Sequence, residues 1–111
     1  MNQLNSLIIE GALTENSKVK EVLGKPVTTF SIGVSRSFKN ASGEEETETF
    51  CFDVEGAFIP EEIQKKLVKN RVVTIVGRLS QTTWTDKGKQ RSKVYVVAEH
   101  ITAKRLIKNR G

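Results

Sequence analysis

The sequence predicts an all-β fold, a five-stranded Greek-key barrel with one short helix between its third and fourth strands. Three observations lead to this prediction. Apolar residues recur with a period of two over most of the chain, one segment alone has helical periodicity, and the order is three strands, one helix, two strands. Such alternation is typical of half-buried strands. At 111 residues the chain fits one domain, expected to span 1–111 with its core at about 4–106.

The strands are expected at residues 4–13, 30–35, 50–55, 73–80 and 92–103. In the second of them, Phe30 begins an alternation of apolar and polar residues that indicates one buried face. Phe50 and Phe52 repeat that alternation in the third strand, so all three phenylalanines are predicted to lie in the core. The polar segment 36–49 between these strands, with its run of three glutamates, is predicted to be a long hairpin loop.

The helix is predicted over residues 60–69. Pro60 suits a first helical position because the N–H that it lacks would have no partner there. Glutamates follow it and lysines come later, which matches the helix dipole, and Asn70 is the expected stop. An apolar stripe is formed by Ile59, Ile63 and Leu67. This order of elements is that of the OB-fold, with SH3-like barrels and small α+β sheets as alternatives.

Composition excludes several classes of function. No apolar run approaches the roughly 18 residues of a membrane span, and residues 1–5 lack the features of a signal peptide, so we expect no membrane partner and a cytoplasmic location. Cys51 is the only cysteine and His100 the only histidine, which leaves no disulfide and no zinc site of several cysteines. Catalytic and phosphate-loop motifs are absent. We therefore expect no enzyme, no metal and no cofactor, and His100 is interpreted as a packing or interface residue.

The net charge of +5 is unevenly distributed. Residues 1–60 contain five Lys/Arg against nine Asp/Glu, whereas residues 61–111 contain 13 against four. A basic half of this kind favours a surface that faces a polyanion, although lysines and arginines that only solubilise the domain would give the same composition.

The segment Gly77–Tyr95 contains the pattern that points to nucleic acid. Trp84, the only tryptophan, is expected at a hairpin and is accompanied by Arg78, Lys87, Lys89, Arg91 and Lys93. An aromatic plane for bases and cations for phosphates are what sequence-tolerant binding of single strands requires. The alternative is that Trp84 folds back as a core residue. Further candidates for this surface are Phe38, between Arg36 and Lys39, and Phe58, which could instead cover the end of the barrel. Tyr95 stays undecided.

Four blocks of this chain resemble the bacterial single-stranded DNA-binding protein family, in order and over roughly residues 5–101. They are residues 5–13 (NSLIIEGAL), residues 24–38 (GKPVTTFSIGVSRSF), Gly77-Arg78-Leu79 with Trp84-Thr85-Asp86, and residues 97–101 (VAEHI). The resemblance implies an OB domain that binds and protects single-stranded DNA in replication, recombination and repair, located with the nucleoid. It also implies stacking on Phe38 and Trp84, phosphate contacts from Arg36, Lys39, Arg78 and the basic hairpin, and a homotetramer.

The chain departs from that family in three respects. The third-strand aromatic is absent at Ala57 or displaced to Phe58, and an aromatic near Cys51 is shifted to Phe50 or Phe52. The sequence also stops at Gly111 without the acidic tail through which the family recruits replication and repair proteins, either because it is the DNA-binding domain of a longer protein or because the protein is tail-less. A tail-less chain resembles the dimeric primosomal paralogues, so an adaptor that bridges replication proteins is the alternative function. RNA binding through the same face is a third hypothesis.

Overall fold

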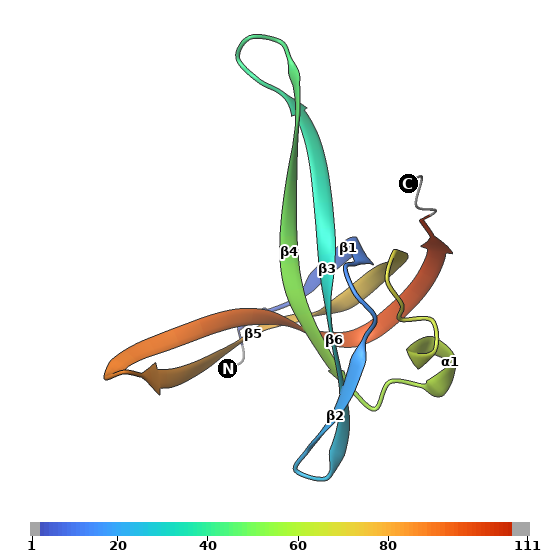
Figure 1. The fold of residues 1–111 in the computed structure, drawn as a ribbon, viewed down its shortest axis with the longest axis vertical. Coiled ribbons are helices and arrows are strands. Elements are labelled where there is room, and N and C mark those ends of the chain that lie inside the picture. Colours follow the sequence, from blue (N-terminus) through green and yellow to red (C-terminus); the bar gives the residue numbers. More distant parts are fainter. Residues whose placement is uncertain (1–2, 108–111) are drawn as a thin grey trace.

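The computed structural model describes residues 3–107 and is built mostly of strands (Figure 1). Within this range the elements are β1 (Leu7–Leu13), β2 (Lys18–Val22), β3 (Lys25–Lys39), β4 (Glu45–Ala57), α1 (Glu61–Gln64), β5 (Arg71–Asp86) and β6 (Lys89–Leu106). None of the described helical residues forms a segment long and apolar enough to cross a membrane.

Five of the strands close into a barrel, which confirms the predicted OB-fold. The sheet order is β1-β5-β6-β4-β3-β2, and an additional pairing between β1 and β3 closes it. Within the sheet, β4 and β6 form a short parallel pair, with Val54 of β4 beside Val96 of β6. At the crossing of β5 and β6, a β-carbon added to Gly77 would lie 2.0 Å from the carbonyl oxygen of Val97. A bulge lies between Val76 and Gly77, so glycine allows the two strands to approach at this corner.

The strand β2 was not predicted, and its burial explains why. It pairs with the first residues of β3, and β1 pairs with residues further along the same strand. All five of its residues are exposed, so no buried face imposes apolar residues at every second position over its whole length. The turn that follows places Leu23 and Gly24 at φ values of 51° and 78°, a left-handed geometry suited to a two-residue hairpin turn.

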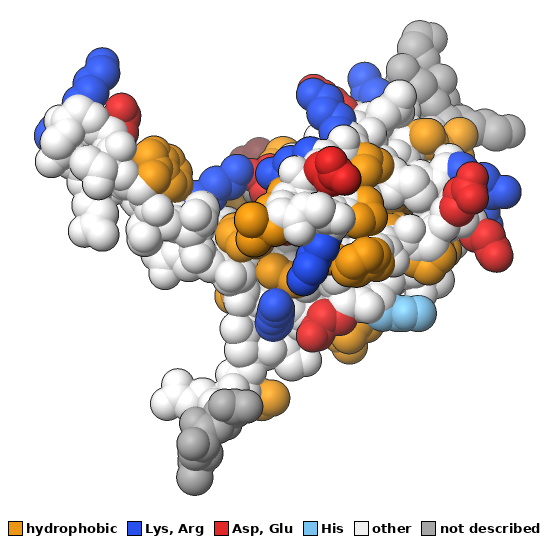
Figure 2. Space-filling view, turned by 90° about the horizontal axis from the view of Figure 1, so that it is seen from below, with side chains coloured by type: hydrophobic (Ala, Val, Ile, Leu, Met, Phe, Trp, Pro, Cys, Tyr) orange, Lys and Arg blue, Asp and Glu red, His pale blue; other side chains and the backbone are white. Residues whose placement is uncertain are grey.

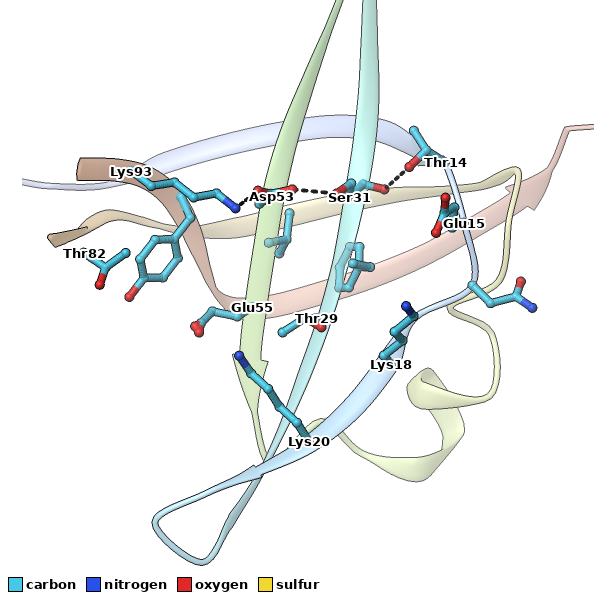
Figure 3. A pocket seen from close by; sticks show the side chains of 14 residues that line it. Thr14, Glu15, Lys18, Lys20, Thr29, Ser31, Asp53, Glu55, Thr82 and Lys93 are labelled. Atoms are coloured by element: carbon cyan, nitrogen blue, oxygen red, sulfur yellow. Dashed lines mark hydrogen bonds and ion pairs between the residues drawn. The ribbon is translucent and has the colours of Figure 1, made fainter. Parts of the chain in front are cut away.

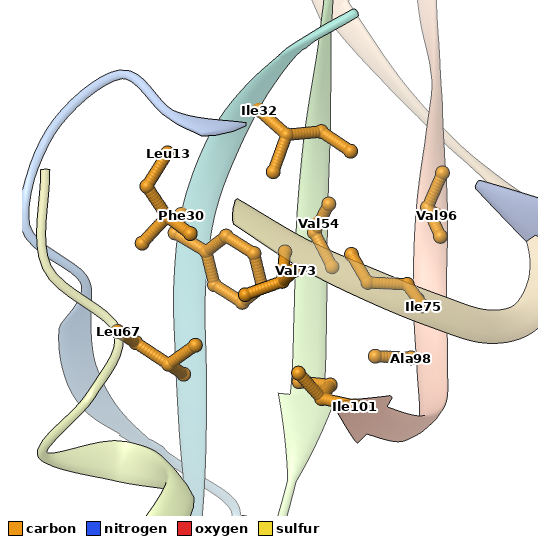
Figure 4. Close-up of a cluster of buried hydrophobic side chains, with 10 residues drawn as sticks. All are labelled: Leu13, Phe30, Ile32, Val54, Leu67, Val73, Ile75, Val96, Ala98 and Ile101. Atoms are coloured by element: carbon orange, nitrogen blue, oxygen red, sulfur yellow. The ribbon is translucent and has the colours of Figure 1, made fainter. Parts of the chain in front are cut away.

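The core lies inside the barrel and draws on every barrel strand. Its buried members include Leu13, Phe30, Ile32, Val54, Leu67, Val73, Ile75, Val96, Ala98 and Ile101 (Figure 4). Phe30 is buried as predicted, but Phe50 and Phe52 are 50% and 38% exposed, so their assignment to the core was wrong. They lie opposite Val34 and Ile32, where β3 and β4 leave the barrel and no third strand covers them.

Two long hairpins project from the barrel as arms. The β3–β4 arm points upward in Figure 1 and the β5–β6 arm points to the left. The predicted loop at 36–49 was wrong in extent, because β3 continues to Lys39 and β4 starts at Glu45. Pairing across the two strands holds this polar segment extended, with hydroxyl contacts such as Ser35 Oγ to Thr49 Oγ1 at 3.0 Å.

The helix α1 is much shorter than the predicted 60–69 and ends before the expected stop at Asn70. Beyond Gln64 the chain is tied to the β1–β2 connection instead: Ser17 N donates to the carbonyl oxygen of Leu67, and Lys69 N donates to Asn16 Oδ1. These contacts replace the helical hydrogen bonds of the last predicted turn. The apolar stripe still performs its predicted role, since Leu67 is buried and Ile59 and Ile63 pack against the core.

Candidate nucleic-acid interface

A groove of about 600 Å³ runs across one face of the barrel, between β2, the β3–β4 sheet and the base of the β5–β6 arm (Figure 3). Its lining includes Lys18 and Lys20 of β2, Thr29 and Ser31 of β3, Asp53 and Glu55 of β4, Thr82 of β5, and Lys93 and Tyr95 of β6. The alternation of β3 and β4 produces this lining: Phe30 and Val54 face the core, so their neighbours Ser31 and Asp53 face outward.

A hydrogen-bonded chain crosses the groove from β3 to β6. The Ser31 hydroxyl donates to Asp53 Oδ1 at 2.6 Å, and the Lys93 ammonium forms an ion pair with Asp53 Oδ2. The hydrogen bond from Lys93, followed by that from Ser31, holds the pKa of the Asp53 carboxyl below its usual value. Both side chains of the ion pair remain about half exposed, so a ligand in the groove can reach them.

The outer half of the β5–β6 arm continues the face of the groove. Residues directly opposite each other in an antiparallel pair point to the same side, as do residues two apart in one strand. Thr82 lies opposite Lys93, and Trp84 lies opposite Arg91. Trp84 is therefore on the groove side of the arm. Its side chain is 47% exposed, which rules out the alternative of a core residue.

The tip of this arm presents its cations to solvent. Lys87 and Gly88 form the turn at φ values of 50° and 77°, and both they and Lys89 are exposed. Arg91 Nε lies 4.0 Å from Asp86 Oδ2, at the limit of an ion pair. Figure 2 shows basic side chains at the tip of the arm, at the left of the view, and further ones on the barrel beside it.

A second hollow of about 220 Å³ extends the groove toward Arg78. The two hollows share Glu55 and Tyr95, and the second is also lined by Arg78 and Val97. Tyr95, which the sequence left undecided, thus lies at the junction of the two. The face from Arg78 past Tyr95 to Trp84 brings together most of the residues predicted for the site.

The structure adds Lys18 and Lys20 to the groove, two residues that the sequence reasoning missed. They belong to β2, which was not recognised as a strand. The period of two between the lysines, with Val19 between them, would have placed both on one face of a strand.

The remaining predicted residues lie elsewhere. The guanidinium carbon of Arg36 lies 5.4 Å from the centre of the Phe38 ring, a cation–π contact, with Lys39 at the end of β3. By alternation Phe38 is on the side of Ile32 and Val34, opposite to the groove side of β3. Phe58 follows β4 at a φ of 54° and is 64% exposed. Neither phenylalanine lines the groove.

Comparison with known proteins places the chain in a family. The model of the "Single-strand binding protein family" matches residues 4–104. A single-stranded DNA-binding protein of Aquifex aeolicus is 35% identical over 100 residues, which are 88% of this chain and 68% of that protein. One from Thermotoga maritima is 34% identical over 104 residues, 91% of this chain and 74% of that protein. The chain covers a smaller share, 58%, of a relative from Treponema pallidum.

Solved structures share the fold at lower sequence identity. The Plasmodium falciparum SSB complex with ssDNA superposes with a TM-score of 0.84 at 19% identity, covering 95% of this chain and 98% of that one. The wild-type single-stranded DNA-binding protein of Thermus aquaticus gives 0.76 at 24% identity and covers 92% of this chain and 50% of that one. With the family model matching nearly its whole length, this chain belongs to the single-strand binding protein family.

Proposed function

We propose that this chain binds single-stranded DNA without reading its sequence and protects it during replication, recombination and repair. The observation that carries the proposal is the continuous face from Arg78 past Tyr95 and Lys93 to Trp84 and Arg91, which combines a groove, two aromatic rings and several cations. A single strand of DNA that lies along this face would meet aromatic rings for its bases and cations for its phosphates in turn.

The chemistry of this face suits binding that ignores base identity. Stacking of a base on an aromatic ring is worth about 1–3 kcal/mol and does not depend on which base it is. We propose Trp84 as the main stacking residue, with phosphates bound by Arg78, Lys87, Lys89, Arg91 and Lys93. Phe38 with Arg36 and Lys39 would then serve as secondary contacts for DNA that continues over the β3–β4 arm. Phe58, beyond the opposite end of β4, would be a separate secondary contact.

The comparisons support DNA binding over the alternatives. The matching relatives are named single-stranded DNA-binding proteins, and one neighbour in fold was solved with ssDNA. An adaptor with only secondary DNA contact is therefore not favoured. The matching family is named for the binding of single strands and not for a catalysed reaction. We propose the same mode for this chain, with the nucleoid as its location.

We also propose that the chain assembles with copies of itself through β1. Ile8, which is 74% exposed, lies opposite Val76 on the outer surface, and Val76 is exposed too. Among the described strands, residues 7–11 of β1 pair only with β5, so the other edge of β1 is open to a further strand. Light scattering tests this: an assembly, as tetramer or dimer, is expected for the wild type, and Ile8→Glu should shift it toward monomer.

Trp84 makes DNA binding directly measurable, because it is the only tryptophan. Titration with oligo-dT at several salt concentrations should quench its fluorescence. The affinity should fall with salt at a log–log slope of about −0.7 per phosphate neutralised. Binding without any change in emission would remove Trp84 from the site, and no binding at low salt would refute the proposed function.

A further inference from the structure

We propose that the carboxylate of Asp53 competes with DNA phosphates for the ammonium group of Lys93. Nucleic acid that enters the groove must then displace Asp53 before a phosphate can bind Lys93. The inference deepens the proposed function and rests on it. It assigns to Asp53 the role of limiting the affinity of the groove, a role that only the fold reveals, because residues 53 and 93 are far apart in the sequence.

The carboxylate is fixed in place from two sides. Ser31 Oγ donates to Oδ1 at 2.6 Å, and the Lys93 ammonium pairs with Oδ2 (Figure 3). Each carboxylate oxygen thus has its own partner, and the one paired with Lys93 occupies a contact that a phosphate oxygen would need. A carboxylate and a phosphate oxygen offer an ammonium group the same kind of charge-assisted contact, so one can replace the other.

The exposure of the pair allows it to open. The side chain of Lys93 is 52% exposed and that of Asp53 is 44% exposed. An ion pair in contact with water is held weakly and is screened by salt. A phosphate with neighbouring contacts on Arg91 and Tyr95 can therefore draw Lys93 away, at the cost of leaving Asp53 unpaired beside the bound strand.

Lys93 differs from the other lysines of the groove because it has a carboxylate partner. Within residues 3–107, Lys93 forms an ion pair, whereas none is found for Lys18 or Lys20. Glu55 lies two residues beyond Asp53 on the same face of β4 and lines the same groove, but takes part in no described ion pair. The chain thus offers a matched control: two carboxylates in one groove, of which one holds a lysine.

The test compares Asp53→Asn with the wild type in oligo-dT titrations over a range of salt. Asparagine keeps the shape and still accepts from Ser31 but lacks the charge. One freed cation adds about 0.7 to the magnitude of the log–log salt slope, which corresponds to roughly fivefold tighter binding at 0.1 M salt. Glu55→Gln removes an equal charge without freeing a lysine, and we expect it to give less than half that gain.

The dependence on Lys93 separates competition from general repulsion. In a Lys93→Gln background, Asp53→Asn should give less than about a twofold gain and leave the salt slope unchanged. An equal gain with and without Lys93, or an equal gain from Glu55→Gln, would overturn the inference. A thermal unfolding curve for each variant shows that it is folded, and Asp53→Ser replaces Asp53→Asn if the latter is not.

The two proposals fail in different ways. If the wild type and every variant fail to bind oligo-dT at low salt, the proposed function is wrong. If the wild type binds and Asp53→Asn binds no more tightly, the proposed function stands and the competition by Asp53 is refuted.

Discussion

The two arms share an architecture but carry opposite charge. Each is a long antiparallel hairpin that leaves the barrel and carries an aromatic ring beyond it, the partly buried Phe38 on one arm and the exposed Trp84 on the other. Residues 34–50 of the β3–β4 arm contain two cations and four glutamates, a net charge of −2. Residues 80–94 of the β5–β6 arm contain four cations and one aspartate, a net charge of +3. The aromatic ring is common to both arms, so charge distinguishes them.

The register shows how the charge of the β3–β4 arm is neutralised. Arg36 lies opposite Glu48, Phe38 opposite Glu46, and Lys39 opposite Glu45. Each basic residue of this arm thus has a glutamate opposite it on the neighbouring strand, and the glutamates outnumber the cations. On the β5–β6 arm, Trp84 lies opposite Arg91 and Thr82 opposite Lys93. A phosphate backbone is therefore expected to follow the β5–β6 arm more closely than the β3–β4 arm, whose aromatic ring we propose as a secondary contact only.

The largest expected effect is that of Trp84→Ala. Loss of one stacking surface should weaken binding of oligo-dT by about 1–3 kcal/mol, measured by anisotropy of a labelled oligonucleotide. Phe38→Ala is the matched change on the other arm, and we expect it to cost clearly less. Equal losses from the two substitutions would show that the arms contribute alike, which would refute the contrast between them.

Removal of a cation is the next largest effect. Arg91→Gln should reduce the magnitude of the salt slope by about 0.7 and weaken binding roughly fivefold at 0.1 M salt, with little dependence on base composition. Lys39→Gln on the β3–β4 arm is its control, because Glu45 lies opposite Lys39. A change in slope of the same size for Lys39→Gln would indicate that phosphates contact both arms.

A smaller effect is expected when the acidic side of the β3–β4 arm is neutralised. Replacement of Glu45, Glu46 and Glu48 by glutamine makes the net charge of this arm positive. If bound DNA passes near this arm, the affinity for oligo-dT should rise by a few-fold at low salt. The gain should vanish at high salt because distant charges are screened. An unchanged affinity for long oligonucleotides would confine the bound strand to the groove and the β5–β6 arm.

Sequence patterns predicted the barrel because its strands are half buried and alternate. The same criterion failed where strands are exposed on both faces, as in β2 and the outer β3–β4 arm. It also misplaced Phe50 and Phe52, since alternation indicates a face and not whether another strand covers that face. The segment around Trp84 was recognised because its aromatic and basic residues are neighbours in sequence.

The groove itself could not be predicted from local pattern. Asp53 and Lys93 meet because β4 and β6 pair in parallel over a short stretch when the barrel closes, and Val54 and Val96 are partners there. No spacing in the sequence encodes that contact. Lys20 enters the same groove only because β2 follows the edge of β3. The parts of the site that depend on closure of the barrel required the structure.

The smallest expected effect concerns stability and tests the ion pair that anchors the β5–β6 arm to the β3–β4 sheet. The contacts from Lys93 and Ser31 lower the pKa of Asp53 from its ordinary value of 3.8. A carboxyl whose pKa is lowered by folding contributes stability above its unfolded pKa and loses it as the pH falls through the folded value. Because the pair is about half exposed, its contribution at pH 7 is expected to be only about 0.2–1 kcal/mol. Urea unfolding should therefore show the wild type slightly more stable than Asp53→Asn at neutral pH, with the difference disappearing well below pH 4. A difference that persists in acid would mean that it does not arise from the charge of Asp53, and that the ion pair with Lys93 does not stabilise the junction.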